Sequence, residues 1–173
     1  LIENMLSVTR LEEGRMNLNI SVELVDDVIQ EALRHVDRKK DEHTITVEHE
    51  DELLLARMDS RLIVQMVINL VDNAIKYTQK GSHIDIRTGR EDKIYTPHRN
   101  LPILNGIMKE HIFETFYTGT NKIADSRRSL GLGLALCKSI VNVHGGEIKV
   151  SDAHPHGAVF QFTLPAGEVY LYE

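Results

Sequence analysis

Cysteine, tryptophan and long apolar runs are rare or absent in this chain. The single cysteine, Cys137, excludes an internal disulfide and favours a reducing compartment. Its apolar surroundings, LALCKSIV, predict a buried structural thiol rather than a nucleophile. No apolar stretch reaches the roughly 20 residues that a membrane-spanning helix needs, and no signal peptide is visible. The formal net charge of -6 argues against a nucleic-acid-binding surface, which would need a basic stripe.

The rest of the composition is that of an ordinary soluble globular domain, with 42% hydrophobic and 27% charged residues among 173. The chain begins in mid-pattern without an initiator Met, so we expect it to be a piece of a larger protein. We expect residues 1–14 to be the last turns of a longer helix, 15–168 to form the main domain, and 169–173 to be a frayed tail.

Hydrophobic periodicity predicts an α+β fold, a two-layer α/β sandwich with helices on one face of a mixed, mostly antiparallel sheet. The predicted helices span residues 22–39, 59–78, 109–116 and 131–144. The predicted strands span residues 16–20, 45–47, 53–55, 84–86, 148–150 and 159–164, with 45–47 and 53–55 antiparallel to each other and the last two forming a hairpin. Residues 121–129 are polar and aperiodic, which predicts a mobile loop.

The segment 59–78 carries a row of polar residues opposite its apolar stripe. Gln65, Asn69, Asn73 and Lys76 recur at helical spacing on that side. Amide oxygens can ligate a hard cation and an ammonium can meet a phosphate, which is typical of a site for a magnesium–triphosphate group. The solvated face of an ordinary amphipathic helix would show the same row, and this helix alone does not separate the two interpretations.

Glycines mark the start of the predicted helix at 131–144. Gly131 and Gly133 stand where a loop gives way to the helix, so bare backbone N–H groups there can approach an anion. The preceding loop carries the cations Lys122, Arg127 and Arg128. A cationic lid over a glycine-lined phosphate site is one interpretation, and a plain turn after a solvated surface loop is the other.

The order of four motifs resembles the catalytic ATP-binding domain of bacterial sensor histidine kinases, in the GHKL superfamily that includes gyrase, Hsp90 and MutL. NLVDNAIKYT is similar to that family's N box, FETFYTG to its F box and LGLGLAL to its second glycine box. LIENMLSVTRLEEGRMNL resembles the end of the dimerisation and phosphoacceptor helix. The segments LSVTRLEEG and IVNVHGG most resemble the sequences of kinases of the potassium-responsive KdpD type.

The resemblance implies the Bergerat ATP-binding fold, with ATP and Mg²⁺ as cofactors. Asn73 and Asn69 would hold the metal, Lys76 would meet the phosphates and Tyr77 would pack near the nucleoside. The implied ATP-binding residues are Asn69, Asn73, Lys76, Tyr77, Lys122, Arg128, Gly131, Leu132 and Gly133, the last three through backbone N–H groups.

The resemblance also indicates the reaction. ATP-hydrolysing relatives place a Glu where this chain has Asn69, and an amide cannot act as a general base. We therefore expect ATP to be held for transfer to a histidine. None of the nine His residues has the phosphoacceptor context, so no catalytic residue is expected here; His144 is interpreted as a cap or a satisfied surface residue. The implied partners are the phosphoacceptor domain of the same protein and a response regulator, in a dimeric, membrane-anchored parent whose kinase domain is cytoplasmic.

The largest departure from the family lies in residues 93–111. Sensor kinases carry an Asp-x-Gly-x-Gly box there, whose Asp recognises adenine, but this segment has no Asp and only Gly106. Either the segment has diverged naturally or its sequence has been replaced, and the intact flanks favour replacement. The rival function is therefore a degenerate interaction module with the same fold and weak or no nucleotide binding.

Overall fold

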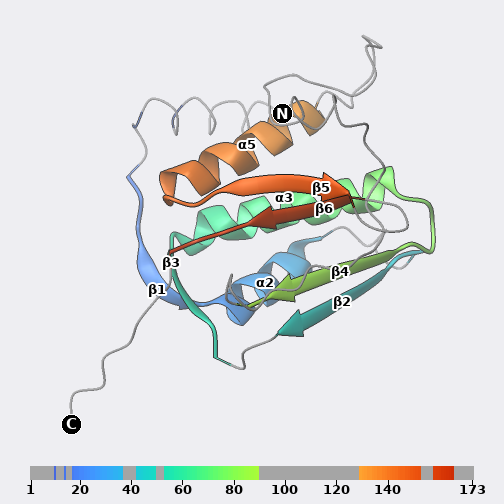
Figure 1. Ribbon diagram of the computed structural model, residues 1–173, viewed down its shortest axis with the longest axis horizontal. Coiled ribbons are helices and arrows are strands. Elements are labelled where there is room, and N and C mark those ends of the chain that lie inside the picture. Colours follow the sequence, from blue (N-terminus) through green and yellow to red (C-terminus); the bar gives the residue numbers. More distant parts are fainter. Residues whose placement is uncertain are drawn as a thin grey trace.

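The computed structural model describes residues 10, 14, 17–36, 42–49, 53–89, 129–152 and 158–165. Helices and strands are interspersed along these residues (Figure 1). In chain order they are β1 (Ser21–Leu24), α2 (Val25–His35), β2 (Thr44–His49), β3 (Leu55–Met58), α3 (Ser60–Tyr77), β4 (His83–Thr88), α5 (Ser129–Val143), β5 (Ile148–Asp152) and β6 (Ala158–Phe162). The predicted helix at 109–116 and residues 121–128 of the predicted loop lie outside the described residues. Ser129, predicted to end that loop, is instead the first residue of α5.

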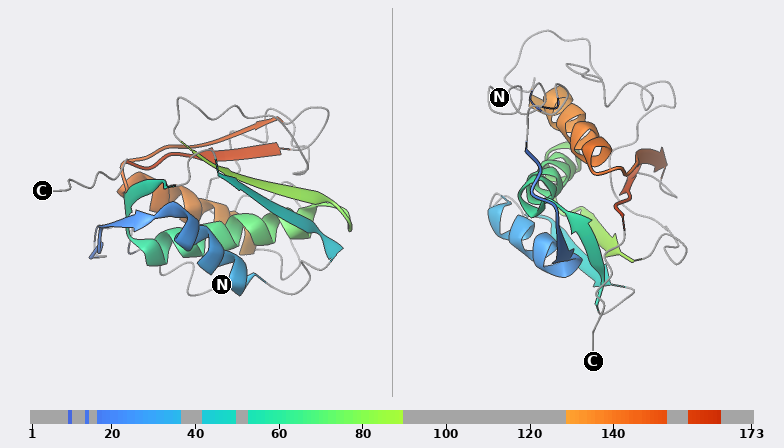
Figure 2. Two further views of the ribbon diagram at one scale, coloured as in Figure 1. Left: turned by 90° about the horizontal axis from the view of Figure 1, so that it is seen from below. Right: turned by 90° about the vertical axis from the view of Figure 1, so that its left-hand side faces the viewer.

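The strands form three pairs on one side of the helices (Figure 2). β1 pairs with β3 and β5 with β6, both antiparallel, whereas β2 pairs with β4 in parallel. The parallel pair needs a crossover, which α3 supplies between β3 and β4. The two-layer α+β architecture and the closing hairpin are as the sequence predicts.

Two strand predictions are wrong. The segments around 45–47 and 53–55 do not pair with each other, because β2 lies beside β4 and β3 lies beside β1. Residues 17–20 are not a strand; the ladder begins at Ser21, where it meets Met58. The predicted helix at 22–39 is shorter than expected. It starts at Val25, because residues 21–24 form β1, and it ends at His35. The Val25 N–H donates to the Leu54 carbonyl at 2.9 Å.

α3 lies at the centre of the helical layer, between α2 and α5. Its predicted apolar stripe faces the core: Leu70 is partly buried, and the other members are buried, namely Ile63, Val67, Val71 and Ala74. Met66 is completely buried as well. α5 contributes the completely buried Leu136, Ile140 and Val141. Each such side chain stabilises the fold by about 1.5–3 kcal/mol relative to exposure to water. Among the described residues, no helix combines the length and the apolar character that a membrane span requires.

Two glycines turn the chain from α5 into β5 for different reasons. Gly145 has a φ of 76°, in the left-handed region, but open space around it. A Cβ added to Gly146 would lie only 1.8 Å from the Thr163 carbonyl oxygen. Gly146 also donates its N–H to the Val141 carbonyl at 3.0 Å, which closes the end of the helix. Close backbone approach between the turn and the end of β6 therefore requires glycine at 146.

We expect Gly145→Ala to lower the free energy of unfolding by about 1 kcal/mol, the strain of a left-handed alanine. Gly146→Ala should lower it by about 3 kcal/mol, because the new Cβ displaces the backbone at Thr163. Urea unfolding of both variants and the parent chain measures the difference. Equal losses in the two variants would contradict the close approach at Gly146.

Candidate functional site

Two amides of the predicted polar row, Asn69 and Asn73, lie on α3 and are called the amide row below. Asn69 and Asn73 are half-buried, and the Nδ2 atom of each is buried without a hydrogen-bond partner among the described residues. A buried amide donor without an acceptor costs about 1–3 kcal/mol, so such atoms are normally satisfied by a ligand, a water or an ion. Lys76 is exposed in the last turn of the same helix. Amide oxygens at Asn69 and Asn73 have the chemistry to ligate Mg²⁺.

α3 and α5 pack antiparallel, and two polar contacts mark their register. At one end the Asp59 N–H donates to Nε2 of His144 at 2.9 Å. Further along, the Cys137 thiol lies 3.8 Å from the Met66 carbonyl oxygen, to which it donates. Met66 follows Asp59 by seven residues, and Cys137 precedes His144 by seven. Seven residues are about two helical turns, so both contacts lie on one face of each helix.

The same register leads to the predicted site. Seven residues beyond Met66 is Asn73, and seven residues before Cys137 is Leu130, in the first turn of α5. Asn73 is therefore level with the first turn of α5. Gly131 belongs to that turn, where N–H groups have no acceptor within the helix, and Leu132 and Gly133 follow directly. The described part of the structure does not include Lys122, Arg128, the side chain of Tyr77 or the surroundings of residues 131–133.

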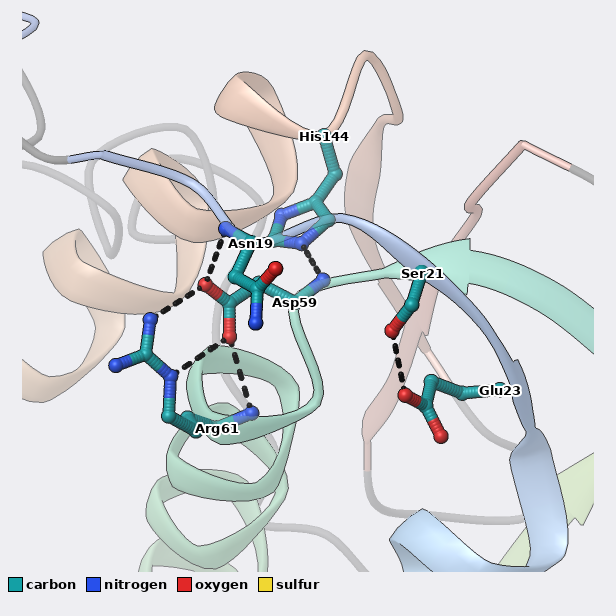
Figure 3. Close-up of polar contacts among 6 residues, drawn as sticks. All are labelled: Asn19, Ser21, Glu23, Asp59, Arg61 and His144. Carbon is teal, nitrogen blue, oxygen red and sulfur yellow. Dashed lines mark hydrogen bonds and ion pairs between the residues drawn. The ribbon is translucent and has the colours of Figure 1, made fainter.

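Asp59 joins several segments at the other end of the helix pair (Figure 3). Its Oδ1 accepts the Arg61 N–H at 3.2 Å, so Asp59 caps the start of α3. The Arg61 guanidinium contacts both carboxylate oxygens, with Nε 3.2 Å from Oδ1 and Nη2 2.9 Å from Oδ2. The Asn19 N–H donates to Oδ2 at 3.0 Å and ties the lead-in to β1 to the same carboxylate.

The environment of Asp59 favours its charged form. Burial by itself raises the pKa of this carboxyl, because the side chain is only 2% exposed. Hydrogen bonds from Arg61 and the Asn19 backbone, with the positive charge of Arg61, outweigh burial and lower the pKa below its ordinary value of 3.8. The charged carboxylate therefore stabilises the fold.

His144 is satisfied, as predicted, but it is buried rather than at the surface, with 6% of its area exposed. Its Nδ1 lies 2.6 Å from the Ile140 carbonyl oxygen, which can only accept, so Nδ1 carries the hydrogen. Nε2 then accepts from the Asp59 N–H. The imidazole is neutral and bonded at both nitrogens. Sequence reasoning missed this contact because its two residues lie 85 positions apart.

Cys137 is a structural thiol, in agreement with the sequence prediction. It is fully buried, and burial raises the pKa of its thiol to about 12. At neutral pH the group is therefore a thiol rather than the nucleophilic thiolate.

We expect Asp59→Asn to keep the helix cap but remove the charge, and to cost about 1–3 kcal/mol of unfolding free energy at pH 7. Because the folded pKa of Asp59 is lowered, its contribution is complete above about pH 5 and is lost as the pH falls through the folded pKa. Urea unfolding between pH 7 and 2.5 should show parent and variant converging in acid. Asp27→Asn, at an exposed position in the first turn of α2, is the control. A constant difference at all pH values would contradict the role of the charge.

Known proteins resemble this chain in sequence and in fold. The model of the family "Histidine kinase-, DNA gyrase B-, and HSP90-like ATPase" matches residues 58–168. Sensor protein KdpD of Clostridium acetobutylicum is 40% identical over 167 residues, which are 95% of this chain and 19% of that protein. The chain thus spans about a fifth of this relative. The KdpD-type resemblance of the sequence is confirmed.

Solved structures of histidine kinases share the fold. The catalytic domain of histidine kinase ThkA is 28% identical, with a TM-score of 0.69 over 87% of this chain and 97% of that domain. Full-length ShkA, solved in complex with AMPPNP, is 19% identical with a TM-score of 0.75, over 98% of this chain and 36% of that protein. The second likeness concerns the fold alone.

The matched family region contains α3, α5 and the closing hairpin. It therefore includes both parts of the candidate site, the amides of α3 and the first turn of α5. The chain belongs to the histidine kinase-, DNA gyrase B- and HSP90-like ATPase family, and within it is similar to the catalytic domains of sensor histidine kinases.

Proposed function

We propose that this chain is the ATP-binding domain of a two-component sensor histidine kinase, which holds Mg-ATP for phosphoryl transfer to a histidine on an upstream domain. One observation carries the proposal: the amide of Asn73, with an unpartnered buried nitrogen, is level with the first turn of α5. A triphosphate between the two helices would meet amides on one side and, on the other, N–H groups that have no acceptor within α5. Family membership supports the same ligand.

Each side chain then has a distinct task. The Oδ1 atoms of Asn73 and Asn69 would ligate Mg²⁺, which neutralises and orients the phosphates when bound. Lys76, exposed in the last turn of α3, would reach the phosphates as a point charge. The N–H of Gly131 would donate to a phosphate oxygen at the positive end of α5, with Leu132 and Gly133 next to it. By the family pattern, Tyr77, Lys122 and Arg128 would also contact ATP.

The amide at Asn69 determines which reaction this site can perform. An amide has no basic lone pair at neutral pH, so Asn69 cannot deprotonate an attacking water. The γ-phosphoryl group would instead pass to a ring nitrogen of an acceptor histidine, with ADP as the leaving group. The proposed partners are the phosphoacceptor domain of a dimeric parent protein and a response regulator. The domain would lie in the cytoplasm, where ATP is available.

Typical enzymes have a kcat of about 1 s⁻¹ or more. We expect this chain alone to hydrolyse ATP far more slowly than that, because Asn69 supplies no base. A coupled assay of ADP release, without any acceptor domain, measures the rate. A chain treated with EDTA is the blank. Rapid Mg-dependent turnover would contradict the assignment and favour a hydrolysing relative.

The second candidate is an interaction module with the same fold and no nucleotide. It is favoured by residues 93–111, outside the described part of the chain, in which the family's adenine-recognising Asp is missing. Losing one charge-assisted hydrogen bond to adenine costs about 1.5–3 kcal/mol, or about ten- to a hundredfold in affinity. The first candidate therefore predicts weak rather than absent binding.

Titration calorimetry with the non-hydrolysable analogue AMPPNP and Mg²⁺ separates the two candidates. We expect weak binding that disappears with EDTA. Asn73→Ala should weaken it by about tenfold or more, because a metal ligand is lost. Asn142→Ala is the matched control, an exposed Asn on α5 far from the proposed site. Mg-independent binding, or equal effects of the two variants, would contradict the metal site; no binding by the parent chain would favour the interaction module.

A further inference from the structure

The imidazole of His144 connects the two helices that carry the candidate site. Its Nδ1–H donates to the Ile140 carbonyl of its own helix, and its Nε2 accepts the N–H of Asp59 at the start of α3. Both nitrogens are used inside the protein, 2.6 and 2.9 Å from their partners. The two hydrogen bonds of the imidazole thus join the end of α5 to the start of α3. They fix the position of α3 along the axis of α5.

We propose that His144 is a positioning residue for the nucleotide site: it sets the axial register of α5 against α3, and so aligns the first turn of α5 with Asn73. This inference rests on the proposed function. It concerns a residue that lies at the opposite end of the helix pair and has no contact with the nucleotide.

A directional bond is needed because the rest of the contact can slide. Both helices contribute to one apolar core, in which Leu136, Ile140 and Val141 of α5 are fully buried, and apolar attraction is non-directional. A slip by one residue moves a helix by about 1.5 Å along its axis. Ligand sites need their groups within about 0.5 Å of the productive geometry. The bond from Asp59 to His144 opposes such a slip, and the weaker thiol contact of Cys137 adds to it.

Two amide replacements separate the two bonds of the imidazole. His144→Asn puts an amide nitrogen near the position of Nδ1, so it can keep the bond to Ile140 but not the one to Asp59. His144→Gln reaches further and can put its carbonyl oxygen near the position of Nε2, so it can accept from Asp59. Val28→Ala removes a buried side chain of α2 and is the control for a loss of stability that leaves the contact between α3 and α5 intact.

The first measurement is the dissociation constant for Mg-AMPPNP, at a temperature where all variants of the 173-residue chain are folded. We expect His144→Asn to weaken binding about three- to thirtyfold, while His144→Gln stays within about twofold of the parent. Val28→Ala should leave the affinity for Mg-AMPPNP unchanged, even if it lowers the melting temperature as much as His144→Asn does. The inference is overturned if His144→Asn binds like the parent or like the control, or if Gln weakens binding as much as Asn.

The second measurement needs no nucleotide. Spin labels on Gln79→Cys and Lys138→Cys, both exposed, report how the end of α3 lies relative to α5, and the buried Cys137 does not react. We expect the distance distribution to shift or broaden in His144→Asn and to stay narrow in His144→Gln. An unchanged distribution in His144→Asn overturns the inference. If the parent chain binds no nucleotide, the proposed function fails, and the label distances still decide the role of His144.

Discussion

The antiparallel contact between α3 and α5 is the interaction on which the rest of this structure depends. α3 lies between α2 and α5 and carries the amide row, and α5 leads through a glycine turn into the closing hairpin. A buried hydrogen bond from the Asp59 N–H to His144 fixes one end of this contact. Because an unsatisfied buried donor would cost about 1–3 kcal/mol, the bond also makes other registers unfavourable.

The two ends of the helix pair differ in how their polar groups are satisfied. At Asp59 the carboxylate accepts hydrogen bonds from Arg61 and the Asn19 backbone, which hold it in its charged form. At Asn69 and Asn73 the amide nitrogens are buried without partners among the described residues. Folding therefore satisfies the structural end completely and leaves binding capacity at the other. This asymmetry is typical of a site whose remaining partners are supplied by a ligand.

Periodicity predicted the helices well, because it reports which face of one segment is buried. The helix predicted at 59–78 is observed as Ser60–Tyr77, and the one predicted at 131–144 as Ser129–Val143. Strand pairing was predicted poorly. Alternation shows that a segment is extended but does not say which neighbour it bonds, so the crossover that pairs β2 with β4 could not be read from it.

The sequence by itself determined the chemistry available to this protein: amides rather than carboxylates at positions 69 and 73, a single inert thiol, and glycines where α5 begins. Only the tertiary structure decided how these groups meet. The register that makes Asn73 level with α5 depends on a bond between His144 and Asp59, 85 residues apart. No local sequence pattern predicts a bond between residues so far apart in the chain. Such a buried hydrogen bond forms only after packing has brought its donor and acceptor together and excluded water.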